Sequence, residues 1–211
     1  LLDICAIGIG GAVRHSTKVT DAELAQVYKW IEAAKKEAPF SIDLITQEAA
    51  LLSARAATVS TAESKENYQK ALDLIQDVPL EKVNENQRGL LANNLAYMRV
   101  KTGGDTDAAL ENIDTAFNLL GPRIELLDTR ATINIEKGEF DRAIEDLKQA
   151  TLFKVDSGVY YFHLALAYQG KGDRDAAAIA LQQAEDLKFT GERIDGLDRE
   201  KYLKLKRWLR R

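Results

Sequence analysis

The sequence predicts an all-α fold built from stacked helical hairpins, and two observations carry that prediction. The first is a period of 34 residues that holds over three consecutive copies. The second is composition, because 29 Ala and 27 Leu stand against 9 Val and 14 Ile in 211 residues. Ala and Leu lose little side-chain entropy in a helix, so this excess favours helices over strands.

The period is visible in four columns of residues. Glycine recurs at positions 104, 138 and 172. The other columns are Ala109, Ala143 and Ala177, then Ile113, Leu147 and Leu181, then Ala116, Ala150 and Ala184. A repeat of this length is typical of a solenoid, in which each unit buries its apolar face only by stacking on its neighbours.

Each copy is predicted to form a helix, a glycine turn and a second helix. In the last copy the apolar positions of the first helix fall at i, i+3, i+4 and i+7, which is one helix face. Gly172 is placed to end that helix, and Asp173 or Asp175 is placed to cap the next one.

These units resemble the tetratricopeptide repeat (TPR), a helix–turn–helix of 34 residues. The last copy matches the family at eight positions: Tyr161, Leu164, Ala165, Tyr168, Gly172, Ala177, Leu181 and Ala184. The middle copy departs at Arg130, where Leu is usual, and at Asn134, where Tyr is usual. The first copy has one extra residue in its turn, at Gly103-Gly104. The resemblance implies a right-handed α-solenoid of stacked TPR hairpins that ends in a C-terminal capping helix.

The three strong copies and weaker matches upstream divide the chain into seven expected segments. They are a degenerate N-terminal helical hairpin (1–40), a degenerate TPR-like hairpin (41–78), an irregular insert (79–89), three TPR units (90–123, 124–157 and 158–191) and the capping helix (192–211).

The C-terminal segment supports two interpretations. Its apolar residues fall near helical spacing, so we expect a helix that covers the apolar edge of the last repeat. Residues 201–211 also carry six basic side chains and no acid. They could contact nucleic acid, an anionic membrane surface or an acidic partner. The favoured interpretation is a solvated helix face whose charge suits the C-terminal end of the helix dipole.

The sequence offers little for catalysis, cofactors or metals. Gly8 to Gly11 follow an apolar run, but the dinucleotide-loop pattern needs a further glycine where Val13 stands. Cys5, His15 and His163 have no metal-ligand spacing. We therefore expect a protein that is not an enzyme, with no cofactor and no metal.

Charge and length limit the possible partners. A net charge of −4 makes nucleic acid an unlikely ligand. The apolar stretch 1–13 is too short to span a bilayer, which needs roughly 20 residues. The chain begins at Leu1 rather than Met, so we expect an excerpt of a longer protein or a processed product. Localisation and oligomeric state are left open.

The TPR resemblance also implies where a partner binds. In this family the first helix of each pair lines a concave groove. The matching positions here are Asn93, Tyr97, Lys101, Glu125, Asp128, Thr132, Glu136, Phe162, Leu166 and Gln169, with His163 at the edge.

The charge of these positions indicates what the groove would accept. The acids of the middle repeat disfavour a clamp for a peptide carboxylate, and they favour a peptide with basic and apolar residues. In the alternative interpretation, Phe162 and Leu166 pack only on the C-terminal helix.

The predicted function is a non-catalytic protein–protein interaction scaffold that presents this groove to a peptide or protein. The alternative is a regulatory or substrate-recruiting TPR domain of a larger enzyme whose catalytic part lies outside this chain.

Overall fold

The computed structural model describes residues 21–38, 41–56, 59–79, 82–153, 157–190 and 194–211. Within these ranges the regular structure is helical throughout. The helices are α2 (Asp21–Glu37), α3 (Ile42–Ala56), α4 (Thr61–Ile75), α5 (Glu85–Thr102), α6 (Thr106–Leu120), α7 (Ile124–Lys137), α8 (Phe140–Thr151), α9 (Val159–Lys171), α10 (Arg174–Asp186) and α11 (Gly196–Leu209).

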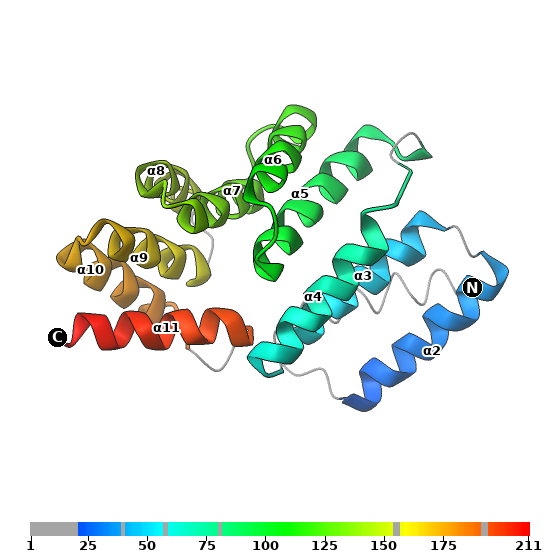
Figure 1. Ribbon diagram of the computed structural model, residues 1–211, viewed down its shortest axis with the longest axis horizontal. Coiled ribbons are helices and arrows are strands. Elements are labelled where there is room, and N and C mark those ends of the chain that lie inside the picture. Colours follow the sequence, from blue (N-terminus) through cyan, green and yellow to red (C-terminus); the bar gives the residue numbers. More distant parts are fainter. Residues whose placement is uncertain (1–20, 39–40, 57–58, 80–81, 154–156, 191–193) are drawn as a thin grey trace.

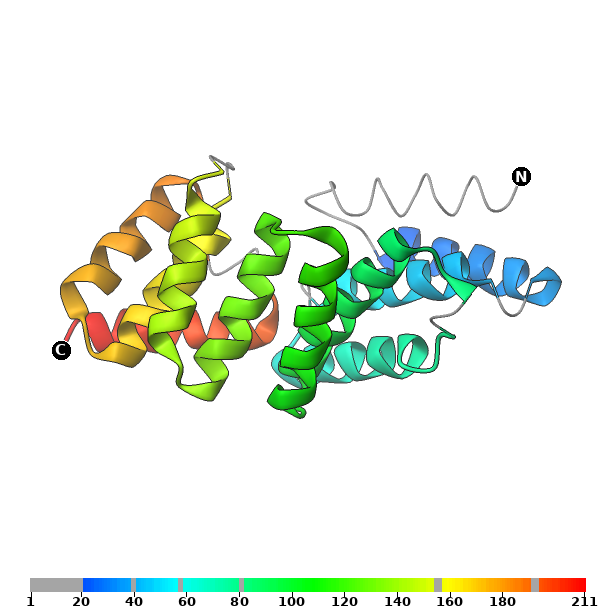
Figure 2. The same ribbon diagram turned by 90° about the horizontal axis from the view of Figure 1, so that it is seen from above.

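Consecutive helices pack as hairpins, and the hairpins stack side by side (Figures 1 and 2). The pairs are α3–α4, α5–α6, α7–α8 and α9–α10, and each of the last three also packs on the pair before it. This arrangement confirms the predicted all-α solenoid. Cys5, His15 and the glycines at 8 to 11 lie outside the described residues, as does much of the expected hairpin 1–40.

Glycines with a left-handed backbone end the first helix of each strong repeat. Gly138 and Gly172 have φ of 78° and 77°, and each caps its helix through its backbone N–H. In the first copy the cap is Gly103, with φ of 72°, rather than the periodic Gly104. The extra residue of that turn therefore follows the cap. A residue with a Cβ pays a steric cost at such a φ.

Polar side chains cap the N-terminal ends of several helices. Asp173 accepts a hydrogen bond from the N–H of Ala176, as one of the two expected caps of α10. Asn84 and Gln87 cap α5 reciprocally, so α5 begins at Glu85, inside the segment 79–89 that was expected to be irregular. The division of the chain into seven segments otherwise stays a prediction.

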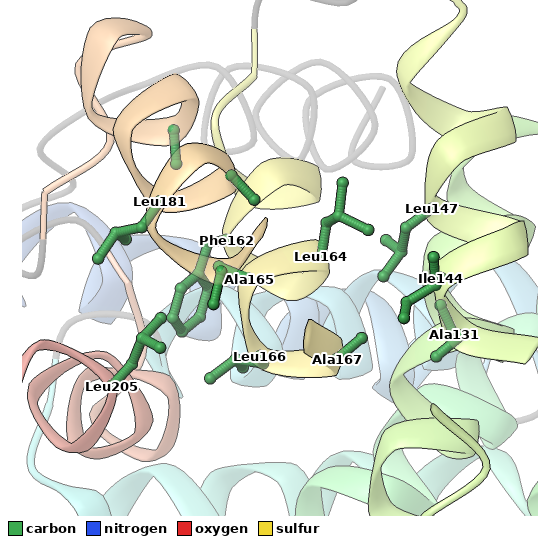
Figure 3. Packing of buried hydrophobic residues seen from close by; sticks show 14 of the residues in the cluster. Ala131, Ile144, Leu147, Phe162, Leu164, Ala165, Leu166, Ala167, Leu181 and Leu205 are labelled. Carbon is green, nitrogen blue, oxygen red and sulfur yellow. The ribbon is translucent and has the colours of Figure 1, made fainter. Parts of the chain in front are cut away.

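The periodic columns form the core of the stack. The alanines at 109, 143 and 177 and those at 116, 150 and 184 are fully buried, as are Ile113 and Leu147. Figure 3 shows Leu147, Leu164 and Ala165 among the side chains packed between α8, α9 and their neighbours. Alanine at these crossings lets two helix backbones approach closely, so each hairpin buries its apolar face against the next.

The unusual Arg130 of the middle repeat has a structural explanation. Its Nε and Nη2 donate to the two carboxylate oxygens of Asp146, at 2.9 and 2.6 Å. Its guanidinium also lies over the ring of Phe117, 4.1 Å from the centroid. Arginine replaces the usual leucine here by joining α7 to α8 through a bidentate ion pair and to α6 through a cation–π contact.

Candidate functional site

The C-terminal helix α11 covers more of the molecule than the edge of the last repeat. It packs on α9, as expected, and it also reaches α4, which precedes all three strong repeats (Figure 1). Residues of α4, α5, α7 and α9 contact α11, and they share one side of the stack. We call that side the inner face. The candidate site is this face together with α11.

The first turn of α11 lies unusually close to α4. The N–H of Gly196 donates to Ser64 Oγ at 3.2 Å, and Thr61 Oγ1 donates to the carbonyl of Gly196 at 3.2 Å. A Cβ added to Gly196 would lie 2.6 Å from the backbone nitrogen of Thr61 and 2.7 Å from its Cα. Such distances are shorter than any van der Waals contact, so only glycine allows this approach.

Two aspartates at the start of α11 surround one buried lysine. Lys101 Nζ donates to Asp195 Oδ2 at 2.8 Å and to Asp198 Oδ2 at 2.5 Å, and the lysine side chain is 2% exposed. Tyr68 donates its hydroxyl to the same Asp195 oxygen at 3.1 Å. The other oxygen of Asp195 accepts from the N–H of Asp198 and so caps α11. One aspartate thus starts the helix and anchors it.

His163 extends this arrangement toward α7. Its Nδ1 lies 2.6 Å from Asp128 Oδ1 and forms an ionic hydrogen bond. Its Nε2 lies 3.8 Å from Asp198 Oδ2, a distance that allows ionic attraction but is too long for a direct hydrogen bond. We call these five side chains the ionic cluster: Lys101, Asp128, His163, Asp195 and Asp198.

The cluster holds its charges strongly. Burial alone would lower the pKa of His163, but Asp128 and Asp198 outweigh it and raise that pKa to about 9. Burial likewise opposes the charge of Lys101, yet Tyr97, Asp198 and Asp195 raise its pKa well above the usual range. The pKa of Asp198 is lowered by Lys101 and His163 against the effect of burial. At neutral pH these three groups are charged.

An apolar contact follows the ionic cluster along α11. Phe162 of α9 points toward Leu205 of α11, and both side chains are fully buried (Figure 3). The ring of Phe162 stacks on Phe189 with centroids 4.9 Å apart and meets Tyr202 edge-on at 6.0 Å. Tyr202 and Leu205 are therefore the apolar anchors of α11.

Ion pairs at the rim of the contact between α11 and the inner face complete it. We call this whole contact the seat of α11. Lys201 pairs with Glu136 of α7. Lys206 and the hydroxyl of Tyr202 both donate to Glu185 at 2.8 Å. These contacts are partly solvated, so each adds little stability, but together they fix the rotation of the helix.

The residues predicted to line a groove fall into three classes of exposure. Buried are Lys101, Thr132, Phe162, His163 and Leu166; partly buried are Asn93, Tyr97, Asp128 and Gln169; exposed are Glu125 and Glu136. Whether any of them contacts a partner stays a prediction.

The placement of two of these residues differs from expectation. His163 was expected at the edge of an open groove, but its side chain is only 4% exposed, because α11 and Asp128 enclose it. Phe162 packs on Tyr202 of α11 and also on Phe189, so its contacts are not confined to the C-terminal helix.

Several residues of the site were not predicted as site residues from the sequence: Ser64, Tyr68, Asp195, Gly196 and Asp198. Only the Asp-x-x-Asp spacing before an apolar helical pattern gave a signal, and it indicates a helix start rather than an ionic anchor. Lys101 lies 97 positions from Asp198 in the sequence, so no local pattern links them.

The ionic cluster holds α11 on the inner face through charged side chains. His163 carries a proton at neutral pH, so it is a poor general base there, and its side chain is 4% exposed. Among the described residues, no group of three or more His, Cys, Asp or Glu side chains is placed to hold a metal ion. None of the described helices is both long and apolar enough to cross a bilayer.

Comparison with known proteins supports the repeat interpretation. The sequence model of the tetratricopeptide repeat family matches residues 159–190, which include α9 and α10. No curated protein sequence matches the chain significantly.

Three solved structures share the fold over most of the chain, and all are of MamA. A crystal structure of MamA protein has a TM-score of 0.56 at 16% identity and covers 89% of this chain and 92% of that one. MamA AMB-1 gives 0.54 at 17% identity, over 89% and 97%. A further crystal structure of MamA gives 0.50 at 18% identity, over 85% and 94%. At these identities the likeness concerns the fold.

Proposed function

We propose that this tetratricopeptide-repeat protein is a non-catalytic scaffold that holds a peptide or helix of another protein on its inner face. TPR units and a MamA-like fold suggest a protein-interaction scaffold. The observation that carries the finer proposal is the seat of α11, because this face already binds a helix through side chains of α4, α5, α7 and α9.

The occupant of the face has the chemistry expected of a partner. α11 combines apolar anchors at Tyr202 and Leu205 with basic residues, one of which, Lys201, pairs with Glu136 of the middle repeat. The stacked helices hold the side chains of the inner face in fixed positions. A segment that docks there therefore costs less conformational entropy than it would on a flexible surface.

The test is capture of a partner followed by titration. The chain is immobilised, exposed to extract of the cells that make it, and challenged with excess soluble chain. A scaffold yields at least one protein whose capture is saturable and competed. No competed protein in any extract would overturn the proposal.

The captured partner is then titrated against two charge-reversal variants. Glu125→Lys changes an exposed acid of α7 on the predicted groove, and Glu111→Lys changes an exposed acid of α6 as the matched control. We expect Glu125→Lys to weaken binding roughly five- to tenfold and the control to leave it unchanged, since a rim charge acts mainly through electrostatic complementarity. Equal affinities for both variants would contradict use of the inner face.

A further inference from the structure

We propose that α11 is an internal ligand of the inner face, and that the partner which replaces it is a helix with the same recognition pattern. That pattern is aspartate at the N-cap and at the third helical position, glycine at the first helical position, then an aromatic residue and a leucine on the same face. The proposal rests on the proposed function, since it names the kind of partner that the scaffold takes.

Each part of the pattern corresponds to a contact on the inner face. The two aspartates, Asp195 and Asp198, both pair with Lys101. They lie at the N-terminus of the helix, where the helix dipole stabilises negative charge. Only glycine fits at position 196, because α4 leaves no room for a Cβ. These features require a particular helix start, and few helices of unrelated sequence satisfy all of them.

The later turns of α11 complete the pattern. Tyr202 and Leu205 lie four and seven positions after Asp198, which places them on the same side of the helix. Both contact the cluster of apolar side chains around Phe162. The opposite side of α11 needs no particular side chains for docking, since Leu203 is 51% exposed and Lys204 is exposed as well. Recognition therefore reads one stripe of the helix.

The physical nature of this interface suits exchange. Burying charged groups costs desolvation energy that their mutual attraction offsets only in part, so an ionic cluster specifies geometry more than it adds stability. The rim pairs of Lys201 and Lys206 are partly solvated and weak. The apolar contribution of α11 comes chiefly from Tyr202 and Leu205, while Trp208 and Leu209 are only partly buried. A partner helix with the same anchors and a larger apolar stripe can displace α11.

Tethering explains why α11 occupies the face in the absence of a partner. A segment joined to its binding site by a short linker has an effective concentration in the millimolar range. A free peptide of the same sequence must overcome that concentration, so it binds the wild-type chain poorly. Preventing α11 from docking removes the competitor and exposes the site.

The experiment uses the chain of 211 residues, its variants and a fluorescent peptide of residues 194–211. Gly196→Ala blocks the approach of the chain's own α11 to α4 without removing any core side chain. Lys204→Ala, on the outward side of α11, is the matched control. We expect the peptide to bind Gly196→Ala at least tenfold more tightly than it binds the wild type or Lys204→Ala. A peptide with Asp195→Lys and Asp198→Lys should not bind. Equal affinity for all three chains, or binding of the reversed peptide, would overturn the proposal.

A second measurement begins with the wild-type chain and guards against misfolding of Gly196→Ala. Amide hydrogen exchange in the wild-type chain should show α11 opening at a lower free energy than α9 and α10, because it undocks locally. In Gly196→Ala the protection of α9 and α10 should persist while that of α11 is lost. Exchange of α11 only together with α9 and α10 would show that it is a fixed part of the fold and overturn the proposal.

The remaining outcomes separate this inference from the proposed function. If the scaffold captures a competed partner but the peptide experiments fail, the scaffold stands and the pattern is wrong. Light scattering over a range of concentrations tests whether the replacing helix belongs to a second copy of the chain. A monomer supports a foreign helix, whereas concentration-dependent dimerisation of the wild type, absent in Gly196→Ala, would assign the exchange to α11 itself.

Discussion

The hairpin α9–α10 and the seat of α11 share Phe162, yet different interactions hold them. Inside the hairpins the contacts are mainly apolar, involve residues close in sequence and recur every 34 positions, as at Ala177 and Leu181. At the seat of α11 an ionic cluster accompanies the apolar anchors, and its Lys101–Asp195 and Lys101–Asp198 pairs join residues 94 and 97 positions apart and occur once. Stacking gives the molecule its shape, and the ionic cluster joins α11 to the stack.

The largest effect should come from removing the cation at the centre of the cluster. Lys101→Met leaves two buried carboxylates, Asp195 and Asp198, without their lysine. An unpaired buried charge of this kind typically costs about 3–5 kcal/mol. Urea unfolding followed by circular dichroism at pH 7 measures the loss. Lys65→Met on the exposed side of α4 is the control, and an equal effect of both substitutions would show that the cluster is not special.

The next effect is the pH dependence of His163. Its folded-state pKa of about 9 lies above the unfolded value of 6.5, so its contribution is complete below about pH 6.5 and is lost as the pH rises through 9. A shift of this size corresponds to about 3 kcal/mol. The groups that face it are Asp128 on α7, Asp198 on α11 and, beyond them, Lys101.

Urea unfolding of the wild type and of His163→Gln between pH 6 and 9.5 measures this contribution. The wild type should lose about 3 kcal/mol more than the variant over that range. Parallel curves for the two chains would mean that the cluster does not hold the imidazolium.

The same contrast shows how much of the molecule the sequence could predict. The hairpins follow from residues that repeat, such as Gly138, Gly172 and the alanine columns, because each contact is local and is made again in the next unit. The capping helix follows from the spacing of Tyr202, Leu205 and Trp208. Its path to α4 does not, since no periodicity connects Gly196 with Ser64.

The groove prediction shows the same limit. The family positions include Lys101 and Phe162, which contact α11, but their role in binding a partner stays a prediction. They could not show that the helix is a segment of the same chain. That depends on the close fit of Gly196 against α4, which leaves no pattern in the sequence.

A third prediction probes the stack itself. Ala177 is fully buried where α10 crosses its neighbours, and Ala178 beside it is exposed. Ala177→Leu forces extra methylene groups into a close-packed crossing and should cost about 1–3 kcal/mol. Ala178→Leu, a matched change with the same helix propensity, should cost less than about 0.5 kcal/mol. Thermal unfolding compares the stability of the two variants. Similar losses of stability would mean that the helix crossing at Ala177 is not closely packed.

The smallest effect should come from an ion pair on the outside of the stack, which isolates what burial contributes to the cluster. Lys137 pairs with Asp107 of α6, but that carboxylate is 80% exposed, whereas the side chains of Lys101 and Asp198 are 2% and 8% exposed. Water and salt screen the outer pair, so Lys137→Ala should cost less than about 1 kcal/mol, and 0.5 M NaCl should reduce that cost further. Lys101→Met should keep most of its cost in the same salt, because the buried charges are screened much less. If salt reduced both losses equally, the difference between the two regions would lie in the number of charges rather than in their burial.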